Sequence, residues 1–249
     1  MSELILALIA GGVVGLALGA LGGGGSVLAV PALIYLLGFT PAAASTAALL
    51  IVLATSLTAL YGHARARNVR WRAGALFAAA GLLPAAAAGA LAARLPQPLL
   101  TAAFAAVAAA AAVRMLRPVQ DVPAGPRGSR PARAAGAGAG LGALTGLLGV
   151  GGGFLAVPAL VTVLAFEMQA AIGTSLLVIS ANSLASLATR GATTAGVDWA
   201  VIGPFTGAAI LGAWDGKRLA TRISGPLLQR TFAVVLLAAA AFMLTDALT

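Results

Sequence analysis

The 249-residue chain contains no cysteine, one histidine and six carboxylate side chains. Without cysteine it cannot form disulfide bonds, thiolate metal sites or a thiol–disulfide relay of its own. One histidine and six scattered carboxylates provide neither a cluster of metal ligands nor a hydrolytic triad. We therefore expect a protein that is not an enzyme and that needs no metal or other cofactor.

Charged residues are also scarce, at 8%, whereas 61% of the residues are hydrophobic and the mean hydropathy is +1.03. Such a chain has too little polar surface for a soluble domain, so an all-α polytopic membrane protein is expected. Its apolar runs cover residues 4–21, 26–38, 41–62, 73–93, 97–116, 135–149, 154–166, 168–189, 199–214 and 226–245. A transmembrane helix needs about 20 residues. The last three runs of each half can therefore cross, 199–214 only by extending past Trp214, whereas the second run of each half is too short.

The two halves of the sequence repeat one another at a separation of 127 residues. Residues 9–33 are echoed at 136–160, each copy having glycines spaced by four, a dense glycine cluster and the segment Leu-Ala-Val-Pro-Ala-Leu. This self-similarity indicates a duplication. We divide the chain into a first membrane repeat at 1–116, a linker rich in proline and arginine at 117–134 and a second membrane repeat at 135–249. Each repeat is predicted to contain a broken-helix hairpin, which turns at the glycine cluster, plus three transmembrane helices.

The basic residues predict how the repeats are oriented. Four arginines lie between His63 and Arg72, and five more lie between Arg114 and Arg133, so both segments are expected on the cytoplasmic side. In the second half the basic residues have moved to the following loop, at 215–222. The two repeats are thus predicted to have inverted topology, with both termini outside the cytoplasm.

The net charge of +9 does not indicate a nucleic-acid partner, because the arginines flank apolar runs and no soluble module is present to display them. The first apolar run is not expected to be a cleaved signal peptide, because no basic segment precedes it. The candidate partners are a small anionic substrate, membrane lipids and, in a homodimer, a second copy of the chain.

The glycines suggest two different roles. Those spaced by four are best explained as small residues that let helices pack closely: Gly11, Gly15, Gly19, Gly138, Gly142 and Gly146. The dense clusters, Gly22–Gly25 and Gly149–Gly153, precede the second run of each half. We call them the first and second elbows. A helix that starts there presents unpaired backbone N–H groups and a partial positive charge, which favour an anion. No Lys-Ser/Thr pair follows, so a P-loop is excluded.

A polar stripe on the run 168–189 points to the same interior region. Ser175, Asn182, Ser186 and Thr189 fall on one helical face, and Asn182-Ser183 aligns with Thr55-Ser56 of the first half. Neutral hydroxyl and amide groups can bind an oxyanion and still release it, but they are equally suited to hydrogen bonds between helices. His63 and Asp215 are better explained as interfacial residues than as members of a proton path.

Taken together, these motifs resemble the TauE/SafE family of sulfite and organosulfonate exporters, over nearly the whole chain. The resemblance rests on the glycine segments 19–25 and 146–154, on Val30-Pro31 and Val157-Pro158, and on the segment 171–176 of the second copy. The first copy departs from it, because it has Thr46-Ala-Ala-Leu49 where the second has Gly-Thr-Ser-Leu. The resemblance implies a permease of the bacterial cytoplasmic membrane for small sulfur-containing anions such as sulfite, sulfoacetate or thiosulfate.

The expected mechanism is alternating access around a midplane site, formed where the two elbows meet. Its candidate substrate-binding residues are Gly22, Gly23, Gly24, Gly25, Ser26, Thr55, Ser56, Gly151, Gly152, Gly153, Thr174, Ser175, Asn182 and Ser183. Two alternatives remain at this point: a permease for a cation or neutral solute on the same scaffold, and a membrane scaffold protein that transports nothing.

Overall fold

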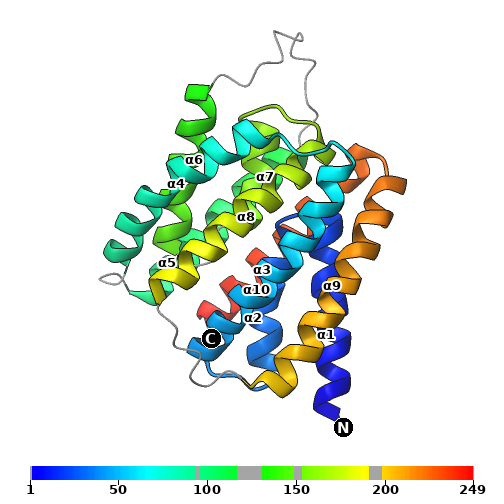
Figure 1. Cartoon of the computed structure of the whole chain (residues 1–249). Coiled ribbons are helices and arrows are strands. Elements are labelled where there is room, and N and C mark those ends of the chain that lie inside the picture. Colours follow the sequence, from blue (N-terminus) through cyan, green and yellow to red (C-terminus); the bar gives the residue numbers. More distant parts are fainter. Residues whose placement is uncertain (1, 93–95, 117–130, 149–152, 191–197, 249) are drawn as a thin grey trace.

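The computed structural model describes all residues except 1, 93–95, 117–130, 149–152, 191–197 and 249. The described residues form α-helices joined by short loops and contain no strand, which confirms the all-α prediction. In chain order the elements are α1 (Ser2–Leu21), α2 (Gly24–Pro31), the π-helical turn η1 (Ala32–Leu36), α3 (Pro41–Arg65), α4 (Trp71–Ala92), α5 (Gln97–Leu116), α6 (Pro131–Leu148), α7 (Gly153–Thr162), α8 (Met168–Arg190), α9 (Trp199–Arg222) and α10 (Gly225–Leu248). Both termini lie at the same end of the bundle (Figure 1).

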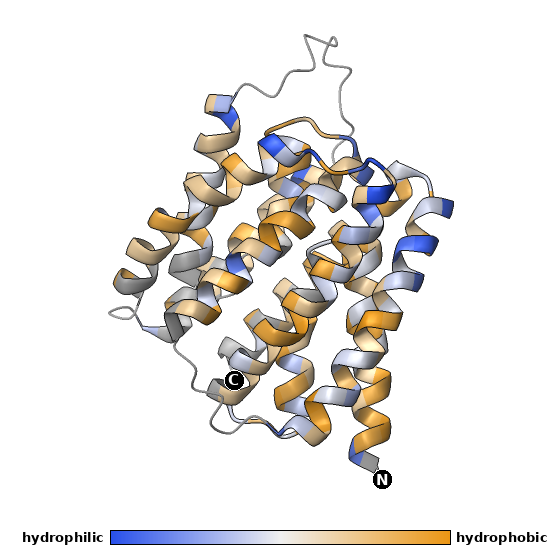
Figure 2. Ribbon diagram, in the orientation of Figure 1, coloured by the Kyte–Doolittle hydropathy of each residue, from blue (hydrophilic) through white to orange (hydrophobic). Residues whose placement is uncertain are grey.

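Within the described part of the chain, five helical segments are long and apolar enough to cross a membrane: Glu3–Leu21, Ala43–Arg65, Trp71–Ala88, Met168–Ala188 and Gly225–Phe242. They come from α1, α3, α4, α8 and α10. Helix α9 continues past Trp214 to Arg222, as expected, but among the described residues neither α9 nor α5 provides such a segment, although both were predicted to cross. Many large apolar side chains are exposed on the bundle, and residues with hydrophobic or intermediate colours make up most of its helices (Figure 2).

The second segment of each half is short, as predicted from the sequence. Helix α2 has 8 residues and continues into the 5-residue turn η1, while α7 has 10 residues. Pro31 lies where α2 passes into η1, and a proline lacks the N–H group that would continue the regular hydrogen-bond ladder. The partner of α2 in the first hairpin is α1, which covers the apolar run 4–21 and extends about 30 Å over its 20 residues.

Glycines bring two pairs of helices into backbone contact. A β-carbon added to Gly11, Gly15 or Gly19 of α1 would collide with the main chain of Phe205, Ala209 or Ala213 of α9, respectively. Gly138 and Gly142 of α6 meet the main chain of α4 in the same way. The packing role predicted for the spaced glycines is confirmed for these five, while the surroundings of Gly146 are outside the description. In both pairs the residue numbers of the contacting positions increase together along the two helices, so α1 is parallel to α9 and α6 is parallel to α4.

Helices α3 and α8 lie at the centre and run in opposite directions. Ser56 of α3 is opposite Ser180 of α8, with 2.8 Å between their hydroxyl oxygens. Further along α3, the Cβ of His63 would be 3.2 Å from a β-carbon on Gly173, which is earlier in α8. Helices α5 and α10 also pack together, and each short helix contacts its neighbour, α2 with α3 and α7 with α8.

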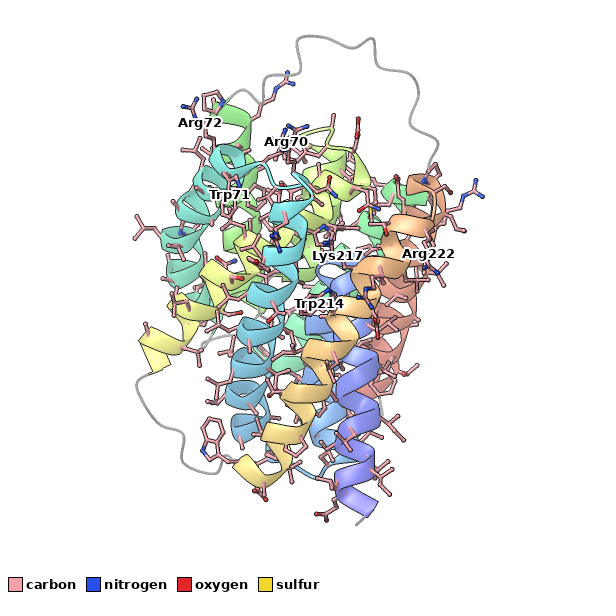
Figure 3. All side chains as sticks on the ribbon, turned by 45° about the vertical axis from the view of Figure 1, so that its right-hand side comes forward. Arg70, Trp71, Arg72, Trp214, Lys217 and Arg222 are labelled. Atoms are coloured by element: carbon pink, nitrogen blue, oxygen red, sulfur yellow. The ribbon has the colours of Figure 1, made fainter. Side chains whose placement is uncertain are left out.

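Basic residues gather at one end of the bundle, away from the two termini. Arg70, Arg72 and Arg222 lie toward this end, which we call the arginine-rich end (Figures 1 and 3). Of the predicted linker, 117–130 lies outside the described residues, and α6 begins at Pro131, inside the range assigned to the linker. Proline is well suited to the first turn of a helix, where its missing N–H group would have no partner.

Candidate functional site

Buried polar side chains concentrate on the two central helices. Eight described polar or charged residues are buried, and seven of them belong to α3 or α8. We call this set the α3–α8 seam: Thr55, Ser56, His63, Thr174, Ser175, Ser180 and Ser183. The eighth, Thr145, lies on α6. The seam brings together five of the residues singled out from the sequence, at the contact between the two halves.

Most hydroxyl groups of the seam are hydrogen-bonded to a main-chain carbonyl of their own helix. Thr55 donates to Ile51 over 2.6 Å, and Ser175 donates to the carbonyl of Ile172 over 2.8 Å. Ser180 also donates to its own helix, and it is within hydrogen-bond distance of Ser56. These bonds give each buried hydroxyl an acceptor. The hydroxyl can still rotate to donate to another acceptor, such as a bound anion.

The first elbow packs against the second half of the chain. Gly22 has a φ of +76°, a conformation that L side chains rarely adopt, and it forms the turn between α1 and α2. A β-carbon there would lie 2.6 Å from the Ser175 hydroxyl oxygen and 3.1 Å from a methyl group of Val157 in α7. Gly23 caps the N-terminus of α2 without a side-chain hydrogen bond. The elbow thus presents a helix N-terminus beside the seam, with no side chain capping it.

The first elbow contacts α8 on the arginine-rich side of the Ser56–Ser180 pair. Ser175, which it touches, precedes Ser180 by five residues, or about 7.5 Å of helix. The neighbouring Thr174 accepts a hydrogen bond of 3.0 Å from the backbone N–H of Arg70, in the loop after α3. The reason is the length of α1, which carries the chain most of the way along the bundle before it turns. The second elbow lies outside the described residues, apart from Gly153 at the start of α7.

His63 is a member of the seam that the sequence did not single out for binding. Its side chain is fully buried, and neither ring nitrogen has a hydrogen-bond partner among the described residues. The backbone of Gly19 lies near the ring, without the geometry of a hydrogen bond. The ring therefore lies between α1, three residues before the elbow, and Gly173, two residues before Ser175. A buried polar group without a partner is costly, so such a group often has a ligand or water in the working protein.

The remaining candidates are distributed as follows. Gly24, Gly25 and Ser26 form the first turn of α2, and Gly151 and Gly152 lie outside the described residues. Asn182, expected to face the site, is only partly buried, whereas its neighbour Ser183 is buried. Outside the seam, Asp215 is exposed and forms a surface ion pair with Arg218.

His63 and Ser180 belong to the seam but were not among the candidate binding residues, and the sequence contains a signal for each. His63 follows Ser56 by seven positions, which places both on one helical face, and Ser180 is three residues before Ser183 on α8. The periodicity was visible, but a single histidine next to an arginine-rich loop is more typical of a membrane interface. Only the packing of α1 and α8 around it reveals its burial.

Comparison with known proteins identifies the family. Residues 7–243 match the family model described as "Sulfite exporter TauE/SafE". Two curated relatives, from Xylella fastidiosa strains 9a5c and Temecula1, are each described as "Probable membrane transporter protein". They are 33% and 32% identical to this chain, over 98% of it and 96% of each relative. No solved structure gives a significant match. The chain therefore belongs to the TauE/SafE family, as its motifs suggested, and is a multi-pass membrane transporter.

Proposed function

We propose that this transporter exports small sulfur-containing anions, such as sulfite, sulfoacetate or thiosulfate, across the bacterial cytoplasmic membrane. The observation that carries the proposal is the contact of the first elbow with Ser175 in the α3–α8 seam. There the turn that leads into α2, whose N-cap is Gly23, lies beside the buried hydroxyl of Ser175 in the other half. The description of the family model as a sulfite exporter is consistent with this chemistry.

The proposed site suits a weakly held oxyanion. Backbone N–H groups at the start of α2 supply the partial positive charge. Ser175 lies beside this turn, and the His63 ring supplies a further N–H donor without a partner in this conformation. Because no fixed positive charge is needed at such a site, the anion is stabilised and can still leave.

We further propose that the two halves are related by a pseudo-two-fold axis in the membrane plane. The pattern of helix contacts supports this: α1 packs on α9, and its counterpart α6 packs on α4, the counterpart of α9. The opposite directions of α3 and α8, which are themselves counterparts, agree with inverted repeats. In such folds, movement of one repeat against the other exposes the site to each side in turn.

The direction of transport follows from the membrane potential. A monovalent anion that leaves a negative cytoplasm gains roughly 2.3 kcal/mol per 100 mV. Export therefore needs no coupled cation, which agrees with the lack of buried carboxylates among the described residues.

Flux into and out of proteoliposomes tests the proposal. Vesicles containing the purified protein are loaded with sulfite, sulfoacetate or the neutral analogue dimethyl sulfone, and a potential of either sign is imposed with valinomycin and potassium. We expect efflux of both anions, faster when the interior is negative, and no protein-dependent efflux of dimethyl sulfone. Equal efflux of the neutral analogue would favour the permease for neutral solutes. A folded protein with no flux of any of these solutes would favour the scaffold alternative.

A further inference from the structure

A second polar feature lies outside the seam, where α3 and α9 run side by side toward the arginine-rich end. A cavity of about 230 Å³ opens there between the two helices. Its polar and aromatic lining consists of Thr58, Tyr61, Gly62, Arg65, Trp214 and Lys217. We call this cavity the α3–α9 pocket.

The pocket holds two cations without a carboxylate partner. Lys217 donates to the carbonyl of Gly62 over 2.6 Å, which uses one of its three N–H groups. Arg65 lies over the ring of Tyr61, 5.5 Å from its centre. Among the described residues the one salt bridge joins Arg218 to Asp215, so neither pocket cation is neutralised by an acidic side chain. A half-buried lysine and an arginine around one cavity create a site for an anion with several oxygens.

The position of the pocket indicates where that anion comes from. Trp214 and Tyr61 are more than half exposed, at 53% and 59%, among many other exposed large apolar side chains. Such amphipathic rings are enriched at the level of lipid headgroups, and Arg65 is the last residue of α3, at the end of a membrane-spanning segment. Trp214 and Lys217 precede Arg222, the last residue of α9, and Figure 3 shows Trp214 below the other two. Basic pockets between helices at this depth are suited to phospholipid headgroups.

We propose that the α3–α9 pocket binds the phosphate of an acidic phospholipid, with Lys217 and Arg65 as its ligands and Trp214 and Tyr61 flanking the acyl chains. The volume accommodates a phosphate and part of its glycerol. Bound there, the headgroup joins α3, which carries half of the seam, to α9, which packs against α1 and thus against the helix that leads into the first elbow. This proposal does not depend on the identity of the transported solute.

Native mass spectrometry of the whole protein, released from micelles containing phosphatidylglycerol or phosphatidylcholine, tests the proposal. We expect one phosphatidylglycerol molecule to be retained more tightly than the others, and no equivalent for phosphatidylcholine. Removing one basic residue near a membrane surface weakens attraction by about fivefold. Arg65→Gln and Lys217→Gln should each lower the affinity of that site by about this factor. Arg218→Gln is the matched control, since it removes the same charge one residue after Lys217 but lies outside the pocket lining.

Three outcomes would overturn the proposal. If Arg218→Gln weakens binding equally, the lipid is held only by general attraction to surface charge. If phosphatidylcholine is retained as tightly as phosphatidylglycerol, the pocket does not select lipids with a net negative charge. Displacement of the lipid by millimolar inorganic phosphate or sulfite would show that the pocket is a site for free oxyanions. If Lys217→Gln does not fold, Arg65→Gln and the charge-preserving Lys217→Arg keep the test decisive. Arg65→Gln should weaken lipid binding, whereas Lys217→Arg should not.

Discussion

The glycine-lined contacts and the α3–α8 seam bring helices together in two different ways. Between α1 and α9, and between α4 and α6, glycines allow main chains to touch. Between α3 and α8, serine and threonine hydroxyls and a histidine are buried instead. Polar burial is expensive in a protein surrounded by lipid, and hydrogen bonds between membrane helices add little net stability. We infer that the first two contacts hold the bundle together and that the seam is retained for transport.

The largest effect is expected at the glycine contacts. Gly15→Ala places a methyl group against the main chain of Ala209, which can be accommodated only if the helices separate, so we expect a loss of about 3 kcal/mol or failure to assemble. In Gly12→Ala the new methyl group meets nothing within 4 Å, and alanine favours helix by up to about 1 kcal/mol. Thermal unfolding in detergent compares the two variants. Equal stability would contradict the packing role.

The next largest effect is expected at Gly22, in the turn that connects α1 of the glycine contacts to the α3–α8 seam. Gly22→Ala combines a backbone cost of roughly 1 kcal/mol at positive φ with a methyl group close to Ser175. Gly38→Ala is its control, since Gly38 has a φ of +68° but open space around it. We expect both to lose similar backbone stability and only Gly22→Ala to lower sulfoacetate flux, roughly tenfold, equivalent to about 1.4 kcal/mol. Equal flux in the two variants would remove the elbow from the site.

A third variant separates stability from function within the seam. His63→Leu replaces two unpartnered ring nitrogens with an apolar side chain, so the protein should gain about 1 kcal/mol of stability while its flux falls. Stability and flux are measured on the same preparation. A variant that is more stable and transports normally would show that His63 takes no part in binding.

The smallest effect is expected for the hydroxyl pair at the centre of the seam. Ser56→Ala, Ser180→Ala and the double variant form a cycle, for which we expect a coupling of about 0.6 kcal/mol in unfolding free energy. A coupling of several kcal/mol would mean that the pair is a structural support and would weaken the contrast with the glycine contacts.

Much of the fold could be predicted from the sequence, because in lipid the length of an apolar run largely decides what it forms. The short second runs became α2 and α7, and the glycines spaced by four became helix contacts. The contact of the first elbow with Ser175 could not be predicted, because it depends on how α1 packs against α9, a contact between residues nearly 200 positions apart. The apolar run 4–21 is long enough for that helix, but the sequence does not show which helix it packs against.

The candidate site was predicted in part. Thr55, Ser56, Thr174, Ser175 and Ser183 are all buried on α3 and α8, whereas Asn182 is only partly buried. A helical-wheel argument finds the polar face of a helix but not the angle at which that face meets its neighbour. The burial of His63 likewise depends on Gly19 and Gly173, whose approach from other helices leaves no local sign in the sequence around residue 63.

The most direct test of the seam uses the absence of native cysteine. Ser175→Cys and, as a buried control outside the seam, Thr145→Cys are treated in proteoliposomes with a membrane-impermeant thiol reagent, with and without sulfoacetate. We predict that Ser175→Cys is modified during turnover and protected by sulfoacetate, while the reaction of Thr145→Cys is unaffected by it. If Ser175→Cys still transports sulfoacetate but sulfoacetate does not change its reaction with the reagent, the anion does not pass the seam and the proposed site is wrong.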